Sequence, residues 1–196
     1  MPNLFVISGP NGAGKSTIAP KLLAGDRRVE EFVNADLIAV KIGGKGAASS
    51  DLRAGKIMLQ RVEELVAKGH DLAFETTLAS RTLLRRIESM RKNGYVFHLI
   101  FLWLPSAEMA VQRVASRVRD GGHSIPEAVV RRRYDRSLRN FFNRYRPIAD
   151  SWLMLDNSGV PEPRPIAWRN VGGPIHIVRD SPWEQLRNRY ETDPFS

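Results

Sequence analysis

The sequence predicts an α/β fold, a three-layer sandwich in which a mostly parallel sheet lies between layers of helices. Two observations lead to this class. Short apolar runs, each long enough for a buried strand, alternate along the chain with longer stretches of helical periodicity. A glycine-rich segment joins the first of these runs to the first helix. With 196 residues the chain is long enough to bury a full core, and we expect one domain.

The glycine-rich segment, GPNGAGKST, has the pattern of a phosphate-binding loop. Its glycines let backbone N–H groups turn inward, and the N-terminus of the following helix adds partial positive charge. Lys15 is expected to reach the β- and γ-phosphates of ATP or GTP, and the Ser16 hydroxyl is expected to ligate Mg²⁺. The predicted nucleotide-binding residues are Gly9, Pro10, Asn11, Gly12, Ala13, Gly14, Lys15, Ser16 and Thr17.

The other elements follow from periodicity and from residues that begin or end helices. Gly69 and Gly94 end two helices, and Ser106 caps a third. The most apolar run, residues 95–104, is expected at the centre of the sheet. Beyond the first strand and helix, which fill residues 3–24, we expect strands at residues 31–34, 71–75, 95–104 and 152–155, and helices at residues 52–68, 80–93, 105–119 and 126–145.

Residues 1–158 are interpreted as the core of the domain, with a lid at about residues 113–133. Residues 159–196 are an extension of the same domain, with a hairpin that pairs residues 166–168 with 175–178 and a short helix near Trp183. In the helix at 126–145, apolar and aromatic residues recur every three or four positions, which predicts one buried face. These residues are Val130, Tyr134, Leu138, Phe141 and Tyr145.

Composition excludes several classes of protein. The chain has no cysteine, so it forms no disulfide or thiolate metal site, as is typical of a reducing cytoplasm. The first strand begins at residue 3, so we expect no signal peptide, and the most apolar run is far too short to cross a membrane. We therefore expect a cytoplasmic protein without membrane contact.

The net charge of +9 is concentrated in one segment. Residues 113–146 contain ten arginines and three acidic residues, which gives 10 − 3 = +7. A local cluster of arginines is typical of a site for a small polyphosphate under a lid, whereas a nucleic-acid partner favours a charge spread over the chain. Nucleic acid is therefore not the expected partner.

The rest of the chain favours a small-molecule kinase among the nucleotide-binding classes. No LSGGQ-like signature of transporter ATPases and no NKxD-type sequence of switch GTPases is present. A kinase needs a carboxylate to activate the acceptor hydroxyl, an acceptor pocket, and cations to stabilise the transferring phosphoryl group. Asp36, which follows the second strand, is the candidate base, and its alternative role is to cap the next helix.

The acceptor pocket and the cations also have candidates. Glu75, Thr76 and Thr77 leave a buried strand at the ligand edge, where they suit acceptor hydroxyls or Mg²⁺, or else form a helix-capping turn. The lid arginines are either cations for the phosphoryl group or a solvated basic face. The chosen candidates are Arg113, Arg117, Arg132 and Arg133.

Two further positions have alternative roles. His123, in the turn between the two lid helices, is either structural or in contact with phosphate and substrate. Asp156 and Asn157, after the last core strand, either contact the nucleotide base or cap a turn.

Five motifs together resemble the zeta-toxin family of P-loop kinases, in particular its small stand-alone branch, also described as predicted ABC-type ATPases. The resemblance covers roughly residues 3–158. The motifs are GPNGAGKST at 9–17, NAD at 34–36, FETTL at 74–78, RVASRVRDGGHSIP at 113–126 and RRRY at 131–134.

The resemblance implies an ATP- or GTP-dependent kinase that, with Mg²⁺, phosphorylates the 3′-hydroxyl of the sugar in UDP-N-acetylglucosamine, and it adds an antitoxin protein to the candidate partners. It implies that Lys15 binds phosphate and that Asp36 activates the hydroxyl. It also assigns Glu75 and Thr77 to the sugar nucleotide, and Arg113 or Arg117 to the lid.

Two positions depart from the family pattern. Thr76 stands where the toxins have glycine, and the second lid arginine of the toxins falls near His123. Either this histidine substitutes for it, or the arginines at 131–133 supply the charge. The alternatives to a sugar-nucleotide kinase are a kinase for another acceptor, such as an antibiotic, a nucleoside or a polynucleotide end, and a non-catalytic regulator that binds ATP.

Overall fold

The structure is a computed structural model. It describes residues 1–24, 29, 31–33, 48–80, 82–122, 124–159 and 162–192, with the backbone alone for residues 48–52, 54–55 and 82.

The centre of the molecule is a seven-stranded sheet with the strand order β2-β3-β1-β4-β5-β6-β7. The first five strands of this order run parallel, whereas β6 and β7 are antiparallel additions at one edge. The predicted α/β class with a mostly parallel sheet is thereby confirmed. The strands are β1 (Asn3–Ser8), β2 (Glu31–Val33), β3 (Leu72–Thr76), β4 (Val96–Trp103), β5 (Ser151–Asp156), β6 (Arg164–Arg169) and β7 (Ile175–Ile177).

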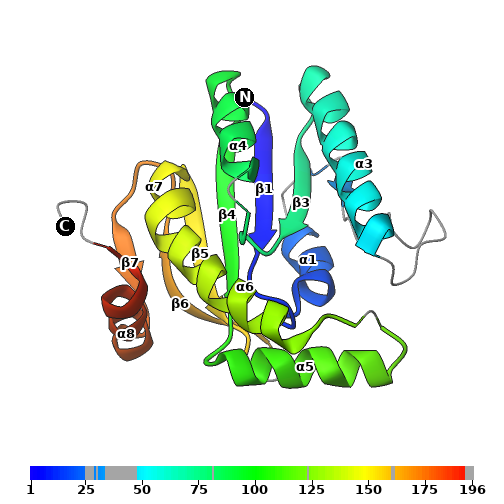
Figure 1. The fold of residues 1–196 in the computed structure, drawn as a ribbon. Helices are drawn as coiled ribbons and strands as arrows, with labels where there is room; N and C mark the ends of the chain where they lie inside the picture. The colour runs from blue at the N-terminus through cyan, green and yellow to red at the C-terminus, as the bar shows by residue number, and fades with distance from the viewer. Residues whose placement is uncertain are drawn as a thin grey trace.

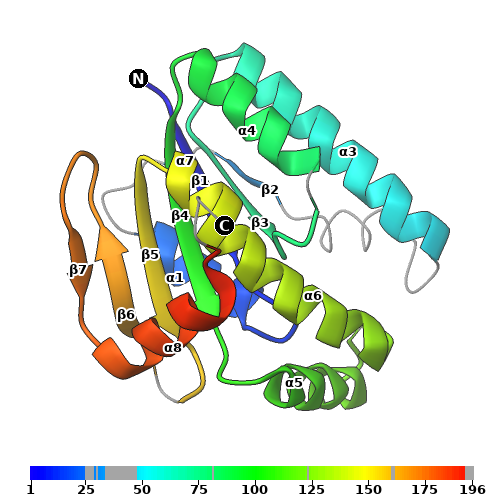
Figure 2. The ribbon, with the colours of Figure 1, turned by 60° about the vertical axis from the view of Figure 1, so that its left-hand side comes forward.

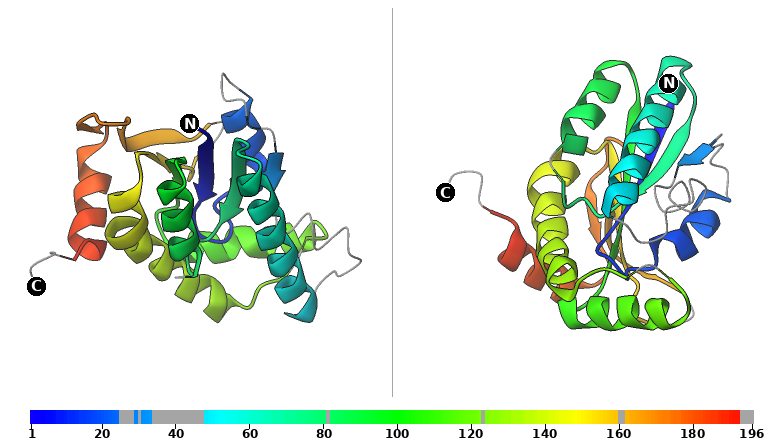
Figure 3. Two further views of the ribbon diagram at one scale, coloured as in Figure 1. Left: turned by 90° about the horizontal axis from the view of Figure 1, so that it is seen from above. Right: turned by 45° about the vertical axis from the view of Figure 1, so that its right-hand side comes forward.

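Helices cover both faces of the sheet. The helix α1 lies on one face, while α3, α4, α6 and α8 lie on the other (Figure 3). The helix α5 runs across the end of the sheet at which the parallel strands terminate (Figures 1 and 2). The helices are α1 (Lys15–Leu23), α3 (Ala48–Ala67), α4 (Thr82–Lys92), α5 (Ala107–Arg119), α6 (Glu127–Asn140), α7 (Arg146–Ile148) and α8 (Asp180–Tyr190).

The apolar strand β4 lies in the middle of the sheet, between β1 and β5, as its composition predicts. Ser106 caps α5, since its side chain accepts a hydrogen bond from the backbone N–H of Met109 at 3.1 Å. The helix α3 begins at Ala48, four residues earlier than predicted, so the polar residues expected to precede the helix form its first turn.

The helix predicted to end at residue 145 continues to Ile148 and contains a π-helical segment, η1 (Phe141–Tyr145). A π turn accommodates one extra residue, so both Phe141 and Phe142 are buried, although a regular helix would turn one of them away from the core. The predicted buried face of this helix is confirmed and gains Phe142. The whole face comprises Val130, Tyr134, Leu138, Phe141, Phe142 and Tyr145.

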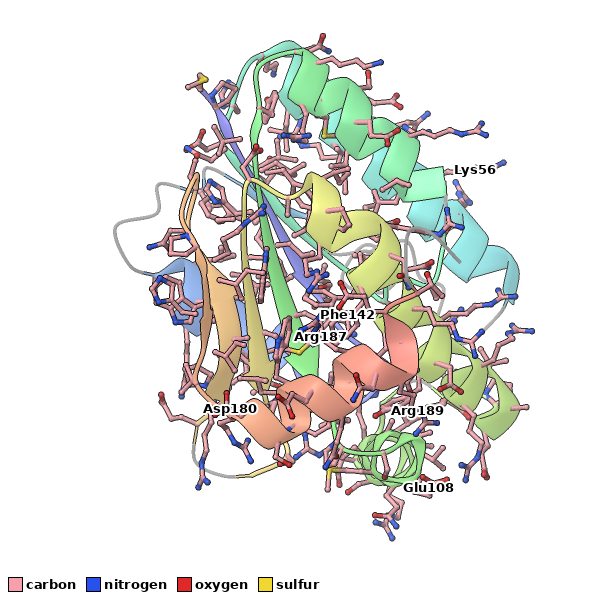
Figure 4. All side chains as sticks on the ribbon, turned by 90° about the vertical axis from the view of Figure 1, so that its left-hand side faces the viewer. Lys56, Glu108, Phe142, Asp180, Arg187 and Arg189 are labelled. Atoms are coloured by element: carbon pink, nitrogen blue, oxygen red, sulfur yellow. The ribbon has the colours of Figure 1, made fainter. Side chains whose placement is uncertain are left out.

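The C-terminal helix α8 is fastened to the core by aromatic packing. Trp183 is 1% exposed and stacks on Trp152, with 5.4 Å between the ring centroids. The ring of Phe142 packs on Trp183 as well, with 5.5 Å between the ring centroids. Figure 4 shows Phe142 beside α8, on which Arg187 is labelled. The guanidinium of Arg146 lies over these rings and forms an ion pair with Glu191.

Among the residues that the structure describes, no helix is both long and apolar enough to cross a membrane.

We expect Trp183→Ala to lower the free energy of unfolding by about 3–5 kcal/mol, because the substitution removes a fully buried indole and leaves a cavity between α8 and the sheet. Urea denaturation followed by far-UV circular dichroism measures this change. The control Val171→Ala alters a side chain that is 61% exposed, and a change within about 0.5 kcal/mol is expected. Equal effects of the two substitutions would contradict the packing of α8 described above.

Candidate phosphate-binding site

The glycine-rich loop leaves the middle of the sheet. Its strand, β1, lies between β3 and β4, and Ser8 at the end of β1 donates a buried hydrogen bond to the carbonyl oxygen of Ile100 at 2.8 Å. The loop occupies residues 9–14, and α1 begins at Lys15. Loop amides and the helix N-terminus therefore lie together at the carboxyl edge of the strands, where α/β proteins bind ligands.

Two glycines allow the loop to pack tightly on other segments. At Gly9 (φ 143°), a Cβ would lie 2.3 Å from the carbonyl oxygen of Leu102 in β4. At Gly12 (φ 78°), a Cβ would lie 2.7 Å from the carbonyl oxygen of Ala110 in α5. Both obstacles are backbone atoms that cannot rotate away. The position of α5 beside the loop thus depends on the absence of a side chain at residue 12.

The residues that follow β5 support the loop from a third side. Asn157 is buried, and its side-chain amide donates a hydrogen bond to the carbonyl oxygen of Ala13 at 2.8 Å. Asp156 accepts hydrogen bonds from the backbone N–H of Ser158 at 2.9 Å and from Arg179 at 2.5 Å. Burial alone would raise the pKa of Asp156, but these hydrogen bonds hold it below its usual value. Asp156 thus has the geometry of a turn cap.

Lys15 and Ser16 stand at the mouth of the loop. The ammonium of Lys15 donates hydrogen bonds to the carbonyl oxygens of Gly9 and Pro10 at 2.9 and 3.0 Å. The hydroxyl of Ser16 lies 2.8 and 3.1 Å from the two carboxylate oxygens of Glu75. Ser16 and Glu75 come into contact because β3 pairs with β1, which places Glu75 opposite Ile7.

The Ser16–Glu75 pair suits a magnesium ion. Mg²⁺ prefers oxygen ligands and is commonly held by one or two protein oxygens together with phosphates and water. A hydroxyl and a carboxylate in contact, next to the phosphate loop, fit that donor set. In the described part of the chain no group of three or more His, Cys, Asp or Glu side chains could hold a metal on its own.

The loop after β3 is held by local and long-range hydrogen bonds. The hydroxyls of Thr76 and Thr77 accept from the backbone N–H groups of Leu78 and Ala79 at 3.1 and 3.4 Å. Leu78 is fully buried and has a left-handed backbone (φ 55°), which is uncommon for a residue with a side chain. Its carbonyl oxygen accepts a 2.6 Å hydrogen bond from the buried Asn140 of α6. Nothing in the sequence indicated this conformation.

The two helices of the predicted lid, α5 and α6, each bring one of the predicted arginines toward the loop. Arg113 of α5 donates to the carbonyl oxygen of Ser158 at 3.1 Å. Arg133 of α6 lies 3.5 Å from the side-chain oxygen of Asn11. Arg117 and Arg132 are exposed on the same two helices.

Two other residues fix the positions of α5 and α6. Arg131 forms ion pairs with Glu108 and Glu127, and its hydrogen bond to Glu108 holds the pKa of that carboxyl below its usual value. Tyr134 anchors α6 to the sheet by donating to the carbonyl oxygen of Leu104 at 2.7 Å. Burial of this hydroxyl raises the pKa of Tyr134 to about 12. The candidate base Asp36 and the lid residue His123 lie outside the described residues.

The family model described as AAA domain (AAA_33) matches residues 4–142 of the chain. An uncharacterized protein of Haemophilus influenzae is 28% identical over 126 residues, which are 64% of this chain and 88% of that protein.

Solved structures with low sequence identity share the fold. AvrRxo1-ORF1:-ORF2 with ATP has a TM-score of 0.72 and 17% identity, covering 95% of this chain; the chain spans only 63% of that protein's length. For the Streptococcus pneumoniae PezAT toxin–antitoxin system the TM-score is 0.66 and the sequence identity 15%, over 100% of this chain and 81% of that chain. For a gluconokinase from Sinorhizobium meliloti the TM-score is 0.50 and the sequence identity 14%, over 81% of this chain and 84% of that chain. The fold is thus that of P-loop kinase-like domains.

We expect Gly12→Ala to weaken ATP binding by more than about tenfold, because the new methyl group would push the loop and α5 apart. Calorimetric titration with ATP measures the affinity. Gly172→Ala is the matched control, since Gly172 also has positive φ but nothing within 4 Å of an added Cβ. Both variants should lose about 1–2 kcal/mol of stability from the left-handed backbone. Unchanged ATP affinity in Gly12→Ala would contradict the tight packing.

Proposed function

Since this chain belongs to the AAA-domain family AAA_33, we propose that it is an ATP-dependent phosphotransferase that transfers the γ-phosphate to a hydroxyl group of a small acceptor. We further propose that the acceptor is UDP-N-acetylglucosamine or a related sugar nucleotide, and that the protein acts as a member of the zeta-toxin group with an antitoxin protein as partner.

The observation that carries the proposal is the contact between Ser16 and Glu75 beside Lys15. It gathers a cation, a hydroxyl and a carboxylate at the mouth of the loop. Loop amides and Lys15 would bind the β- and γ-phosphates, while Ser16 and Glu75 would hold Mg²⁺. When bound, the ion neutralises charge on the phosphate oxygens.

The lid supports phosphoryl transfer rather than nucleotide binding alone. Arg113 and Arg133 come from two different helices; Arg113 contacts Ser158 after β5, and Arg133 contacts Asn11 in the loop. Cations placed in this way stabilise charge that spreads over the transferring group. The helices α5 and α6, which already lie beside the loop, would also help to exclude water, which would otherwise compete with the acceptor hydroxyl.

The proposed step uses Asp36 as the general base. The carboxylate of Asp36 takes the proton of the acceptor hydroxyl as its oxygen attacks the γ-phosphorus. The bond between that phosphorus and the β–γ bridging oxygen breaks, and ADP leaves. Support for a sugar-nucleotide acceptor comes from the motifs NAD at 34–36 and FETTL at 74–78. Support for an antitoxin partner comes from the likeness to a toxin–antitoxin system.

Mass spectrometry of the products tests the proposal. Purified protein with Mg²⁺-ATP is incubated with UDP-N-acetylglucosamine and, in a separate tube, with a bacterial metabolite extract. The expected product is the sugar nucleotide carrying one additional phosphate. A phosphorylated species that forms only in the extract would replace the acceptor but keep the kinase. Absence of product in both tubes, together with ATP binding, would favour a regulator that binds ATP without transfer.

Two variants separate the roles of the base and the loop. Asp36→Asn should lower turnover by about 10²–10⁴-fold and leave ATP affinity unchanged, because only proton removal is lost. Lys15→Ala should lower both ATP affinity and turnover, the latter on the order of 10²–10³-fold. Lys21→Ala is the matched control, because Lys21 lies on the same helix and, among the described residues, its one ion pair is an exposed one with Glu162. Near-normal turnover in Asp36→Asn would refute its role as base.

A further inference from the structure

A hollow of about 640 Å³ lies beside the loop that follows β3. Ala79 and Ser80 of that loop form one wall. Arg136, Arg139 and Arg144, from α6 and η1, line the hollow together with Asn140. We call it the arginine pocket. No residue predicted to be part of the site lies in it.

No described carboxylate forms an ion pair with the arginines of the arginine pocket. Within the described part of the chain, Arg136, Arg139 and Arg144 form no ion pair with a carboxylate, whereas their neighbours Arg131 and Arg146 do. The three arginines are spaced three and five residues apart along one continuous helix, and all three line the same hollow. Three like charges around one concavity attract an anion.

The pocket is also joined to the proposed acceptor loop by the helix that carries its arginines. Asn140 donates a 2.6 Å hydrogen bond to the carbonyl oxygen of Leu78. Tyr145 donates to the carbonyl oxygen of Ser80 at 2.7 Å. An anion held by Arg139 and Arg144 would therefore have a defined position relative to the loop at residues 76–80.

We propose that the arginine pocket binds a phosphate or diphosphate group of the acceptor, while the acceptor hydroxyl lies toward the phosphate loop. Guanidinium groups bind phosphate through paired hydrogen bonds, which suits this group of three. Arg133, which approaches the phosphate loop, precedes Arg139 by six residues, or about 9 Å along the helix axis. That separation matches an acceptor whose sugar lies between its hydroxyl and its phosphate. This inference rests on the proposed function and restricts the acceptor to phosphorylated molecules.

Binding of inorganic pyrophosphate tests the pocket without turnover. The protein is first saturated with Mg²⁺ and a non-hydrolysable ATP analogue, so that the phosphate loop is filled, and pyrophosphate is then titrated by calorimetry. We expect one pyrophosphate per chain, with affinity that falls as the salt concentration rises. Arg139→Gln and Arg144→Gln should each weaken this binding by about tenfold or more, because each removes charge-assisted hydrogen bonds.

The control Lys92→Gln removes one positive charge from an exposed position at the far end of α4 and should leave the affinity unchanged. Absence of pyrophosphate binding, or equal binding by the two arginine variants and the control, would overturn the proposal.

Competition between pyrophosphate and UDP-N-acetylglucosamine identifies the source of the phosphate. Displacement of pyrophosphate by UDP-N-acetylglucosamine would support an acceptor site, whereas simultaneous binding of both would overturn it in favour of a separate anion site. Arginine-dependent binding without phosphorylation of any acceptor would support the pocket and refute the proposed kinase activity.

Discussion

Tight backbone packing around the phosphate loop is the constraint on which the rest of the structure depends. The loop contacts β4 at Gly9 and α5 at Gly12, at distances that leave no room for a side chain. Asn157 adds a hydrogen bond from the segment after β5. Because these supports come from three separate parts of the chain, the loop has its shape only when the sheet, α5 and the end of β5 are all in place.

The long helix from α6 to α7 organises the opposite side of the site. Its aromatic face packs on the sheet, and the π-helical segment allows Phe141 and Phe142 to be buried together. Through Trp183 the same aromatic cluster holds α8, so the C-terminal helix completes the core instead of extending away from it. The same helix also carries Arg136, Arg139 and Arg144, which form no ion pair with a described carboxylate and line the arginine pocket together with the buried Asn140.

Local patterns in the sequence were sufficient for the loop, for the α/β class and for the central position of β4, because each depends on residues close together in the chain. The sequence placed Glu75 at the ligand edge of the sheet but not in contact with Ser16, since that contact requires β3 to lie beside β1. The left-handed backbone of Leu78 had no local signal, because it is stabilised by Asn140, 62 residues away. The π-helical segment was likewise missed, since helical periodicity assumes a regular spacing.

One helix contacts both loops of the site: α6 reaches the phosphate loop through Arg133 and Asn11, and reaches the loop after β3 through Asn140. A small rotation of this rigid element would change the two loops together. For the proposed kinase, the consequence would be thermodynamic linkage between the nucleotide and the acceptor. If binding of nucleotide shifts α6, the affinity for the second substrate changes by a certain factor, and that substrate must change nucleotide affinity by the same factor. Ordered or synergistic binding would then be a property of the helix rather than of either loop.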